Sequence, residues 1–405
     1  MEIIQIVPGL PPAISGVGDY AFLLAKQLLA AHGILTTFVV CDTGWSSAVS
    51  ETTKAETLKW GGRQQVSGPE APVCWDGFPV YQLKARNAAE MLRVLSGPGM
   101  PATVLLHYVG YGYEKRGCPV WLVNALRAWA KAEKLKPETL KLENKESAPT
   151  SDLRSPISER QLITMFHELY ATGKPWQSSF WTSPIQQWTA KSLACMSKHC
   201  ITNLRRNVPV LQRMSGNDDS AFTVLPVFSN VGEPEWLPDW NNRRACMIVF
   251  GSAVQRRKVY FEYSADLERS CQSLNLTEIV DIGKPFKLPP LSVKISQRGI
   301  LPAQEISMHM LSARAAFFAY PVPYLGKSTI FAAYAAHGLL PITFTSNTEL
   351  SQETVFIGEY FVSASFDNIF NEDKQKYVSS NIYNWYQGHS LIKQAKIYAK
   401  FFTNI

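Results

Sequence analysis

Lysine, serine and threonine residues near the end of this chain stand in a pattern that suits phosphate binding. The segment YPVPYLGKSTIFAAYAAHGLLPI, residues 320–342, contains GKST, which also closes the P-loop pattern G-x-x-x-x-G-K-[ST]. That pattern requires a glycine where this chain has Pro321. A proline removes a backbone N–H from a loop that binds phosphate through N–H groups. The sequence therefore disfavours a nucleoside-triphosphate P-loop.

The same segment still predicts a phosphate-binding helix end. An apolar run at 315–320 is followed by a proline- and glycine-containing loop, and then by an alanine-rich helix that begins near Ser328. The start of a helix offers N–H groups and the positive end of the helix dipole, which suit an anion. Lys327, Ser328 and Thr329 are therefore candidate contacts for a diphosphate.

A glycine-rich segment, PGLPPAISGVGDYAFLLAKQL at residues 8–28, is a second candidate. Gly16, Gly18 and Ala21 satisfy the dinucleotide fingerprint G-x-G-x-x-A, and Asp42 closes the next expected strand. In the dinucleotide fold the first glycine follows its strand almost at once, whereas here about nine residues intervene. The loop length disfavours an NAD-dependent enzyme. It leaves two interpretations, a loop that reaches toward a ligand and a purely structural turn.

Two histidines stand at the ends of neighbouring strands. His107 closes the apolar run in TVLLHYVGYGY, and His167 closes the run in ITMFHEL. Ligands bind at the carboxyl ends of strands in open α/β sheets, so both side chains are candidates for a site. A single histidine there is often structural, and no Asp, Glu or Cys stands at metal-ligand spacing beside them.

A basic turn is the fourth candidate. The segment VFGSAVQRRKVYFEYS, residues 249–264, places Arg256, Arg257 and Lys258 just after an apolar strand. Guanidinium and ammonium groups there could clamp a diphosphate, and an ordinary solvated basic loop is the alternative. The nucleophile motif G-x-S-x-G is absent from the chain, which gives a serine hydrolase little support.

Composition limits the class of protein. The chain has 405 residues, 46% of them apolar and 18% charged, which fits two globular domains. Its net charge of +7 suits anionic ligands or an acidic membrane surface but is too diffuse to indicate nucleic acid. Seven cysteines without a C-x-x-C pair predict a reduced, cytoplasmic protein. No apolar run approaches the ~18 residues of a membrane span, so we expect a soluble or at most peripheral protein.

Short apolar runs alternate with helical patterns, which predicts an α/β fold with parallel sheets covered on both faces. The expected strands are 3–7, 36–41, 80–83, 103–107, 162–166, 222–226, 247–250, 278–282, 315–320 and 340–344. The expected helices are 18–32, 87–96, 119–134, 185–196, 257–274, 303–312, 328–337 and 391–402. Polar pauses divide the chain into an N-terminal domain (1–232) with an exposed insertion (135–160), a C-terminal domain (233–388) and a final helix (389–405).

In this order the segments resemble the retaining, family-4 ("group 1") glycosyltransferases of the GT-B fold. The family's P-x-x-x-G-G-x-G loop looks like residues 15–20, its catalytic-site histidine is matched by His167, and its hinge V-x-P-N-G-V-D looks like VLPVFSNVGEPE (224–235). The family's G-R-x-x-x-x-K-G segment corresponds to FGSAVQRRKVY, and its E-G-F-G-L-P-x-L-E-A-M-A-C-G-L-P-V segment to LGKSTIFAAYAAHGLLPI. The resemblance covers nearly the whole chain and implies two Rossmann-like, doubly wound parallel-sheet domains that face a central cleft.

The resemblance also implies an activity and a set of site residues. The chain would move a sugar from a nucleotide-diphosphate donor to a hydroxyl of a glycan or lipid-linked glycan, with retained configuration and no metal. It would act in polysaccharide biosynthesis, in the cytoplasm or against the inner face of an anionic membrane, and without nucleic acid. His167 would be catalytic, the final helix would pack back toward the N-terminal domain, and the remaining roles divide by substrate. The donor contacts would be Gly16, Val17, Gly18, Arg257, Lys258, Lys327, Ser328 and Thr329, and the acceptor-side residues His107, Tyr111, Glu168 and Trp176.

The chain departs from the family at the donor sugar. The two glutamates of the family's E-x7-E pair fall on Leu325 and Ala333, and the family arginine after the strand falls on Ser252. Arg256 or Arg257 could replace that arginine, and Lys327 could supply charge near the missing glutamate. The losses leave a second interpretation open, a non-catalytic GT-B protein that binds a sugar nucleotide or serves as a partner subunit.

Overall fold

The computed structural model describes residues 1–13, 15–46, 72–132, 160–216, 221–344, 356–364 and 371–403. The insertion expected at 135–160 lies outside these residues except for its last position. The chain forms two compact units, which are described separately. Unit 1 comprises Met1–Thr202, Asn207–Thr223 and Ala399–Ile405, and unit 2 comprises Asn203–Arg206 and Val224–Tyr398.

Unit 1 contains an eight-stranded sheet in the order β3-β4-β2-β1-β5-β6-β7-β8. All the strand pairs with a recorded register are parallel except β3–β4. The strands are β1 (Glu2–Val7), β2 (Leu35–Val40), β3 (Val73–Trp75), β4 (Phe78–Gln82), β5 (Thr103–Tyr108), β6 (Gln161–Phe166), β7 (His199–Thr202) and β8 (Phe222–Val224). The helices are α1 (Gly16–His32), α2 (Ala88–Leu95), α3 (Gly110–Tyr113), α4 (Val120–Lys131), α5 (Ser178–Met196) and α6 (Val208–Ser215).

Unit 2 contains a six-stranded parallel sheet in the order β11-β10-β9-β12-β13-β14. Counted from its first strand this is the order 3-2-1-4-5-6 of a doubly wound dinucleotide-binding fold. The strands are β9 (Arg244–Phe250), β10 (Glu278–Ile282), β11 (Lys294–Gly299), β12 (Ala313–Phe318), β13 (Leu340–Thr343) and β14 (Val362–Ser363). The helices are α7 (Ala253–Arg257), α8 (Ser264–Ser273), α9 (Ala303–Ser312), α10 (Thr329–Ala336), α11 (Glu372–Gln387) and α12 (Leu391–Thr403).

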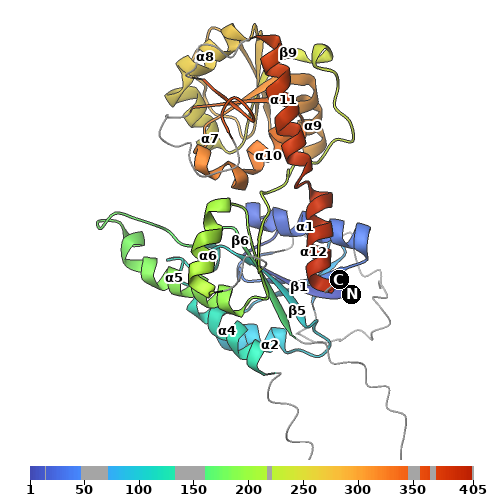
Figure 1. Cartoon of the computed structure of the whole chain (residues 1–405), viewed down its shortest axis with the longest axis vertical. Coiled ribbons are helices and arrows are strands. Elements are labelled where there is room, and N and C mark those ends of the chain that lie inside the picture. The colour runs from blue at the N-terminus through green and yellow to red at the C-terminus, as the bar shows by residue number, and fades with distance from the viewer. Residues whose placement is uncertain are drawn as a thin grey trace, which may run out of the picture. The chain divides into compact units, whose positions relative to one another are not determined.

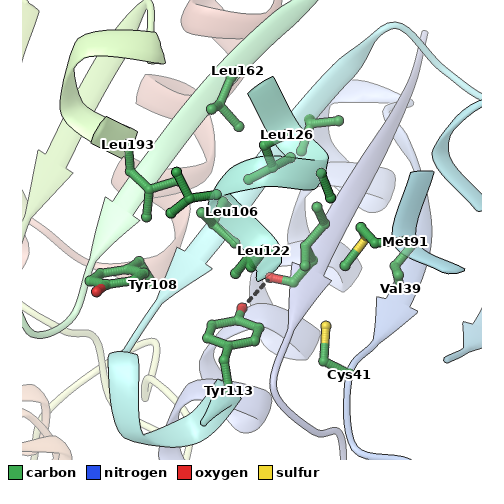
Figure 2. Close-up of a cluster of buried hydrophobic side chains, with 14 of the residues drawn as sticks. Val39, Cys41, Met91, Leu106, Tyr108, Tyr113, Leu122, Leu126, Leu162 and Leu193 are labelled. Carbon is green, nitrogen blue, oxygen red and sulfur yellow. Dashed lines mark hydrogen bonds between the residues drawn. The ribbon is translucent and has the colours of Figure 1, made fainter. Parts of the chain in front are cut away.

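Helices cover both faces of the sheet in unit 1 (Figure 1). One face packs against α2, α4 and α5 through a large apolar cluster, part of which is drawn in Figure 2. The opposite face packs Val7, Phe38 and Phe78 against Ala21 and Ala25 of α1. Strands buried on both sides explain why these segments read as continuous apolar runs in the sequence.

Tyr113 ties the two central strands of unit 1 together. Its hydroxyl lies in the buried cluster of Figure 2, 3.1 Å from the carbonyl oxygen of Ile6 and 2.8 Å from that of His107. Burial raises the pKa of Tyr113 well above its ordinary value, so the hydroxyl stays protonated as a hydrogen-bond donor. The carboxyl end of β1 is thereby fixed next to that of β5.

The elements match the expected pattern closely, with several differences. The sequence analysis missed the strands β3, β7, β11 and β14 and the helices α3, α6 and α11. It began α5 too late, at residue 185 instead of 178. The helix expected at 257–274 is divided into α7, a π-helical turn (Lys258–Glu262) and α8. The strands β3, β7 and β14, of two to four residues, carry too little periodicity to be recognised, whereas β11 (KISQRG) and α11 are polar over most of their length.

The end of α12 groups with unit 1. There the side-chain amide of Gln161 donates to the carbonyl of Phe401 at 2.8 Å, and the ring of His199 stacks on Phe401 at a centroid distance of 4.5 Å. Among the described residues no helix is both long enough and apolar enough to cross a membrane.

We expect Gly18→Ala to destabilise unit 1, because a Cβ at this position would lie 2.4 Å from the carbonyl oxygen of Gly9. Relief of that overlap must shift backbone, and we estimate a cost of about 1–3 kcal/mol in the free energy of unfolding. Gly16→Ala is the matched control, because a Cβ there meets no atom within 4 Å. Urea denaturation of both variants measures the difference, and equal stabilities would contradict the close contact.

Candidate functional site

The strand order of unit 2 creates a place for a ligand between β9 and β12. The chain leaves the carboxyl ends of these neighbouring strands in opposite directions, toward α7 and toward α10, which is where doubly wound folds bind ligands. A small cavity lies at this point, and Gln255, Arg256, Ser328 and Ile330 contribute to its lining. The two segments that the sequence analysis selected in this half of the chain are therefore brought together.

The start of α10 has the geometry of an anion site. Ser328 is buried and caps the helix, since its hydroxyl accepts the N–H of Phe331 at 3.2 Å. The N–H of Ser328 itself is used, because it donates to the carbonyl of Leu325 at 3.0 Å. Thr329 and Ile330 are then the first-turn residues whose N–H groups have no place in the helical ladder. The amides available to a phosphate are those of Thr329 and Ile330, one residue later than Ser328.

Lys327 lies immediately before this helix start and is half-buried. Its ammonium nitrogen is 5.3 Å from the centroid of the Tyr324 ring, and the Arg206 guanidinium lies 3.9 Å from the same ring. The tyrosine face therefore holds two cations close to the positive end of α10. Two cations beside a helix start favour an anionic ligand over a neutral one.

Arg256 has a structural role and not a ligand-binding one. Its side chain is fully buried, and its guanidinium makes a 2.5 Å ion pair with Asp281. It also donates to the carbonyls of Gly251, at 3.0 Å, and Lys284. All three nitrogens are engaged inside unit 2, so the idea that Arg256 replaces the family arginine at a diphosphate is wrong. The residue instead joins the turns that follow β9 and β10.

Arg257 and Lys258 remain the exposed cations of this turn. The Arg257 guanidinium lies 4.7 Å from the centroid of the Phe286 ring, and the buried guanidinium of Arg256 lies 5.0 Å from the same ring. The hydroxyl of Ser252, at the position of the family arginine, caps α7 by accepting the N–H of Gln255 at 3.3 Å. The assignment of Arg257 and Lys258 to a donor therefore stays a prediction.

The two positions of the family glutamates lie inside the core. Leu325 is 2% exposed and Ala333 is 0% exposed. Carboxylates in such surroundings would need buried partners, which an apolar side chain does not require. At these two positions the side chains pack in the core.

In unit 1 the two predicted histidines are in contact. His107 Nδ1 lies 3.2 Å from His167 Nε2, and the rings stack at a centroid distance of 5.5 Å. His107 Nε2 in turn lies 2.8 Å from Oε1 of Gln5 on β1. Because β5 lies between β1 and β6, these three side chains form one buried chain across the centre of the sheet.

The order of donors in this chain follows from Gln5. Its amide oxygen can only accept, so Nε2 of His107 carries the proton, and Nδ1 of His107 is left to accept from Nε2–H of His167. Burial, and next to it the charge of His167, lower the pKa of His107 well below its ordinary value, which keeps this imidazole neutral. Gln5 and His107 thereby fix the tautomer of His167.

The helix start predicted to contact a ligand packs on this pair. Tyr20 of α1 meets both imidazoles edge-on, at centroid distances of 5.8 Å for His107 and 5.2 Å for His167. Ser15 caps α1 by accepting the N–H of Gly18 at 3.1 Å, so Gly16, Val17 and Gly18 form its first turn. Gly18 is needed for the backbone contact with Gly9, which supports the structural interpretation of this glycine.

Three residues of this region were missed by the sequence analysis, namely Gln5, Asp19 and Tyr20. Gln5 was visible as a polar residue inside the apolar strand EIIQIV, and it is fully buried. Asp19 lies in the first turn of α1, where burial raises its pKa to about 6. Tyr20 carried no signal, because an aromatic residue in an apolar helix is usually core.

The other acceptor-side candidates are Tyr111, Glu168 and Trp176. The hydroxyl of Tyr111 accepts from the side-chain amide of Gln186 at 3.2 Å. Glu168 is exposed next to His167. Trp176 is 76% exposed, with the Lys174 ammonium 5.3 Å from its ring centroid. Their roles toward an acceptor stay predictions.

Comparisons with known proteins agree on the fold. No protein-family model and no curated protein matches this sequence. Three solved structures of 8–11% identity align with the whole chain and with at least 97% of their own length. One is described as trehalose-6-phosphate from E. coli bound with UDP-2-fluoro glucose (8% identity, TM-score 0.57, covering 99% of that chain). A UDP-N-acetylglucosamine 2-epimerase from Listeria monocytogenes (11%, TM-score 0.53, 97%) and the lipopolysaccharide outer core galactosyltransferase WaaB (10%, TM-score 0.51, 100%) are the others.

These similarities show the fold. The chain has the GT-B fold, with two Rossmann-like units built on parallel sheets, as the sequence resemblance implied. Structural likeness of this kind extends to both sugar transferases and epimerases, and it leaves the reaction to be argued from the side chains.

We expect Arg256→Met to lower the free energy of unfolding by about 3–5 kcal/mol, because it leaves the Asp281 carboxylate buried without its cation. The double variant Arg256→Met with Asp281→Leu should regain part of the loss. Arg257→Met, an exposed neighbour of the same type, should change stability by less than about 1 kcal/mol. Chemical denaturation gives all three values, and equal effects at positions 256 and 257 would overturn the structural assignment.

Stability should fall with acidification because several histidines are neutral when folded. Burial lowers the pKa of His337 to about 4 and that of His389 to about 3, and it lowers the pKa of His107 as well. Below the unfolded value of 6.5 the unfolded chain binds more protons, so this stability is complete above pH 6.5 and is lost as the pH falls toward the folded values. Each such histidine contributes up to about 1.4 kcal/mol per pH unit.

The variant His107→Asn isolates one of these contributions. Between pH 6.5 and pH 5 its stability should depend on pH less steeply than that of the wild type, by up to about 1.4 kcal/mol per pH unit. The raised pKa of Asp19 acts in the opposite direction below pH 6 but is common to both proteins. His32→Asn at the exposed end of α1 is the control. Identical slopes for His107→Asn and the wild type would contradict a neutral buried imidazole.

Proposed function

We propose that this protein is a glycosyltransferase that moves a sugar from a nucleoside-diphosphate sugar to a hydroxyl group, with retention of configuration. The observation that carries the proposal is the start of α10, where two first-turn amides and a lysine meet at the switch point of a GT-B unit. A diphosphate is the part of a sugar nucleotide that such a helix start binds best.

Unit 2 binds the donor in this proposal. The diphosphate lies on the amides of Thr329 and Ile330, with Lys327 on one side and Lys258 or Arg257 on the other. As the bond to the sugar breaks, negative charge grows on the leaving phosphate oxygen. Fixed cations and helix-end amides stabilise that charge without having to reorganise.

Unit 1 contributes His167 to the sugar. The buried chain from Gln5 through His107 fixes the orientation of this imidazole, so His167 meets the sugar ring in one tautomer. His107 acts through His167 and is therefore a positioning residue. The acceptor is a glycan or a lipid-linked glycan, which places the protein in polysaccharide biosynthesis, in the cytoplasm at the inner face of a membrane.

A non-catalytic sugar-nucleotide-binding protein is the second candidate. Leu325 and Ala333 are apolar and buried where the family carries its glutamates, and this observation favours loss of turnover. His167 and Lys258, which match the family's histidine and lysine, favour activity, and His167 is held in a buried hydrogen-bonded pair with His107. Epimerisation is a third outcome to separate, since one similar structure is described as a UDP-N-acetylglucosamine 2-epimerase.

Nucleotide binding tests the donor site directly. A thermal-shift panel of UDP, GDP, ADP and their common sugars should raise the melting temperature with one nucleotide family, because a ligand that binds only the folded chain stabilises it. Lys327→Ala and Lys258→Ala should each weaken that nucleotide roughly 10- to 100-fold, the worth of a charge-assisted contact. Lys396→Ala, which removes an exposed lysine from α12, should leave affinity unchanged. Equal loss of nucleotide affinity in all three variants would contradict the assignment of Lys327 and Lys258 to the donor site.

Product analysis then separates the candidates. Incubation of the bound sugar nucleotide with acceptor glycans, followed by NMR of the anomeric proton, should show transfer with retained configuration. His167→Ala should abolish transfer while nucleotide affinity stays within about three-fold, since the imidazole faces the sugar in this proposal. Binding without transfer or hydrolysis would favour the non-catalytic candidate, and a changed sugar still attached to its nucleotide would show an epimerase.

We propose that no metal takes part. Lysines and helix amides supply the positive charge in this proposal, so a divalent cation is not needed to neutralise the diphosphate. Turnover should therefore be unchanged by EDTA at a concentration that strips Mg²⁺ and Mn²⁺. A loss of turnover that either ion restores would contradict the metal-free proposal.

A further inference from the structure

Helix α5 presents an unusual face to water. Its outward residues recur at helical spacing and are large and apolar, with Trp181 71% exposed, Ile185 47% and Trp188 41%. Trp176 and Phe180, which lead into this face, are 76% and 42% exposed. Figure 1 shows α5 at the outer side of unit 1, with the chain before it projecting away from the sheet. We call these five residues the aromatic face.

The opposite side of the same helical turns is polar. Gln186 is 1% exposed, and its side chain bonds to the Tyr111 hydroxyl, the Arg116 carbonyl and the Ala171 N–H. Thr189 is fully buried and lies 2.9 Å from the Tyr108 hydroxyl. Surface helices normally bury their apolar side and expose their polar side. The first half of α5 does the reverse while its buried polar groups are satisfied, so its orientation is set by specific bonds.

Basic side chains border this face. Between residues 169 and 217 the sequence has six Lys and Arg and no Asp or Glu, of which Arg205 and Arg206 belong to unit 2, and Glu168 and Asp218 stand at the two ends of the stretch. Lys174 precedes the aromatic face, and Lys191 follows it one turn after Trp188. The Arg127 guanidinium of α4 lies 5.6 Å from the ring centroid of Trp188.

A hollow of about 480 Å³ adjoins the aromatic face between α5 and α6. Cationic side chains of both helices line it, and no acidic residue is among the described residues of its lining. It has room for a phosphate-bearing headgroup. The lining residues are Tyr170, Gln187, Trp188, Lys191, Val210, Arg213 and Met214.

We propose that the aromatic face of α5 and the adjoining hollow form a docking surface for an anionic phospholipid membrane. Tryptophan rings partition to the bilayer interface, where an amphipathic helix lies in the membrane plane. Lysine and arginine side chains around them attract anionic headgroups. A second copy of the chain fits less well, because a two-fold contact would place Lys174 and Lys191 against like charges. The inference rests on the membrane location proposed above, for which it names the surface, and it does not require transferase activity.

Flotation of the full chain with phospholipid vesicles tests the proposal. The protein should bind vesicles that contain phosphatidylglycerol, should bind phosphatidylcholine vesicles weakly, and should be released by salt. Trp181→Gln with Trp188→Gln should lower the partition coefficient roughly ten-fold for each ring removed. Lys191→Glu and Arg213→Glu should each lower it at least about five-fold on the anionic vesicles. Trp236→Gln, which removes a 68% exposed tryptophan from unit 2, is the matched control and should bind like the wild type.

All of these positions are exposed or line an open hollow, and unchanged circular-dichroism melting curves will confirm that the variants fold. Equal flotation of wild type and both sets of variants would overturn the proposal, as would failure of the wild type to float with anionic vesicles. A dimer in analytical ultracentrifugation that dissociates in the tryptophan variant would assign the face to a second copy instead. Because no sugar nucleotide is added, failure here is distinguishable from failure of the proposed activity.

Discussion

Parallel strand pairing is the constraint on which both candidate sites depend. Each sheet is built outward in two directions from its first strand, so the loops after that strand and its later neighbour leave in opposite directions. In unit 1 these loops follow β1 and β5, and in unit 2 they follow β9 and β12. The histidine pair with α1, and the capped start of α10 with the basic turn, lie where they do because of this winding.

Most of the strands and helices could be predicted from the sequence. Long apolar runs predicted the central strands, because strands buried on both faces leave no alternation to confuse them with surface segments. Short edge strands such as β14 were invisible, since two residues carry no period. The π-helical turn (Lys258–Glu262) that divides the helix expected at 257–274 was also not predicted.

The residues of the candidate sites could likewise be predicted only in part from the sequence. Position at a strand end was enough to select His107 and His167, but the partner that orders their protons, Gln5, lies about a hundred residues away in the chain. Adjacent cations in the sequence, Arg256 and Arg257, look equivalent there. The rotation of the helix separates them, so that Arg256 is buried in an ion pair with Asp281 whereas Arg257 faces water. Such distinctions come from tertiary packing, which no local pattern records.

The pairing of Arg256 has a consequence for recognition. Its guanidinium joins the turn after β9 to the turn after β10, so the backbone at this edge of unit 2 is already ordered before any ligand arrives. A ligand that binds there loses little conformational entropy in organising the loop. In the proposed function, discrimination among nucleotides would then come from direct contacts to base and sugar, because an ordered phosphate site binds all diphosphates alike.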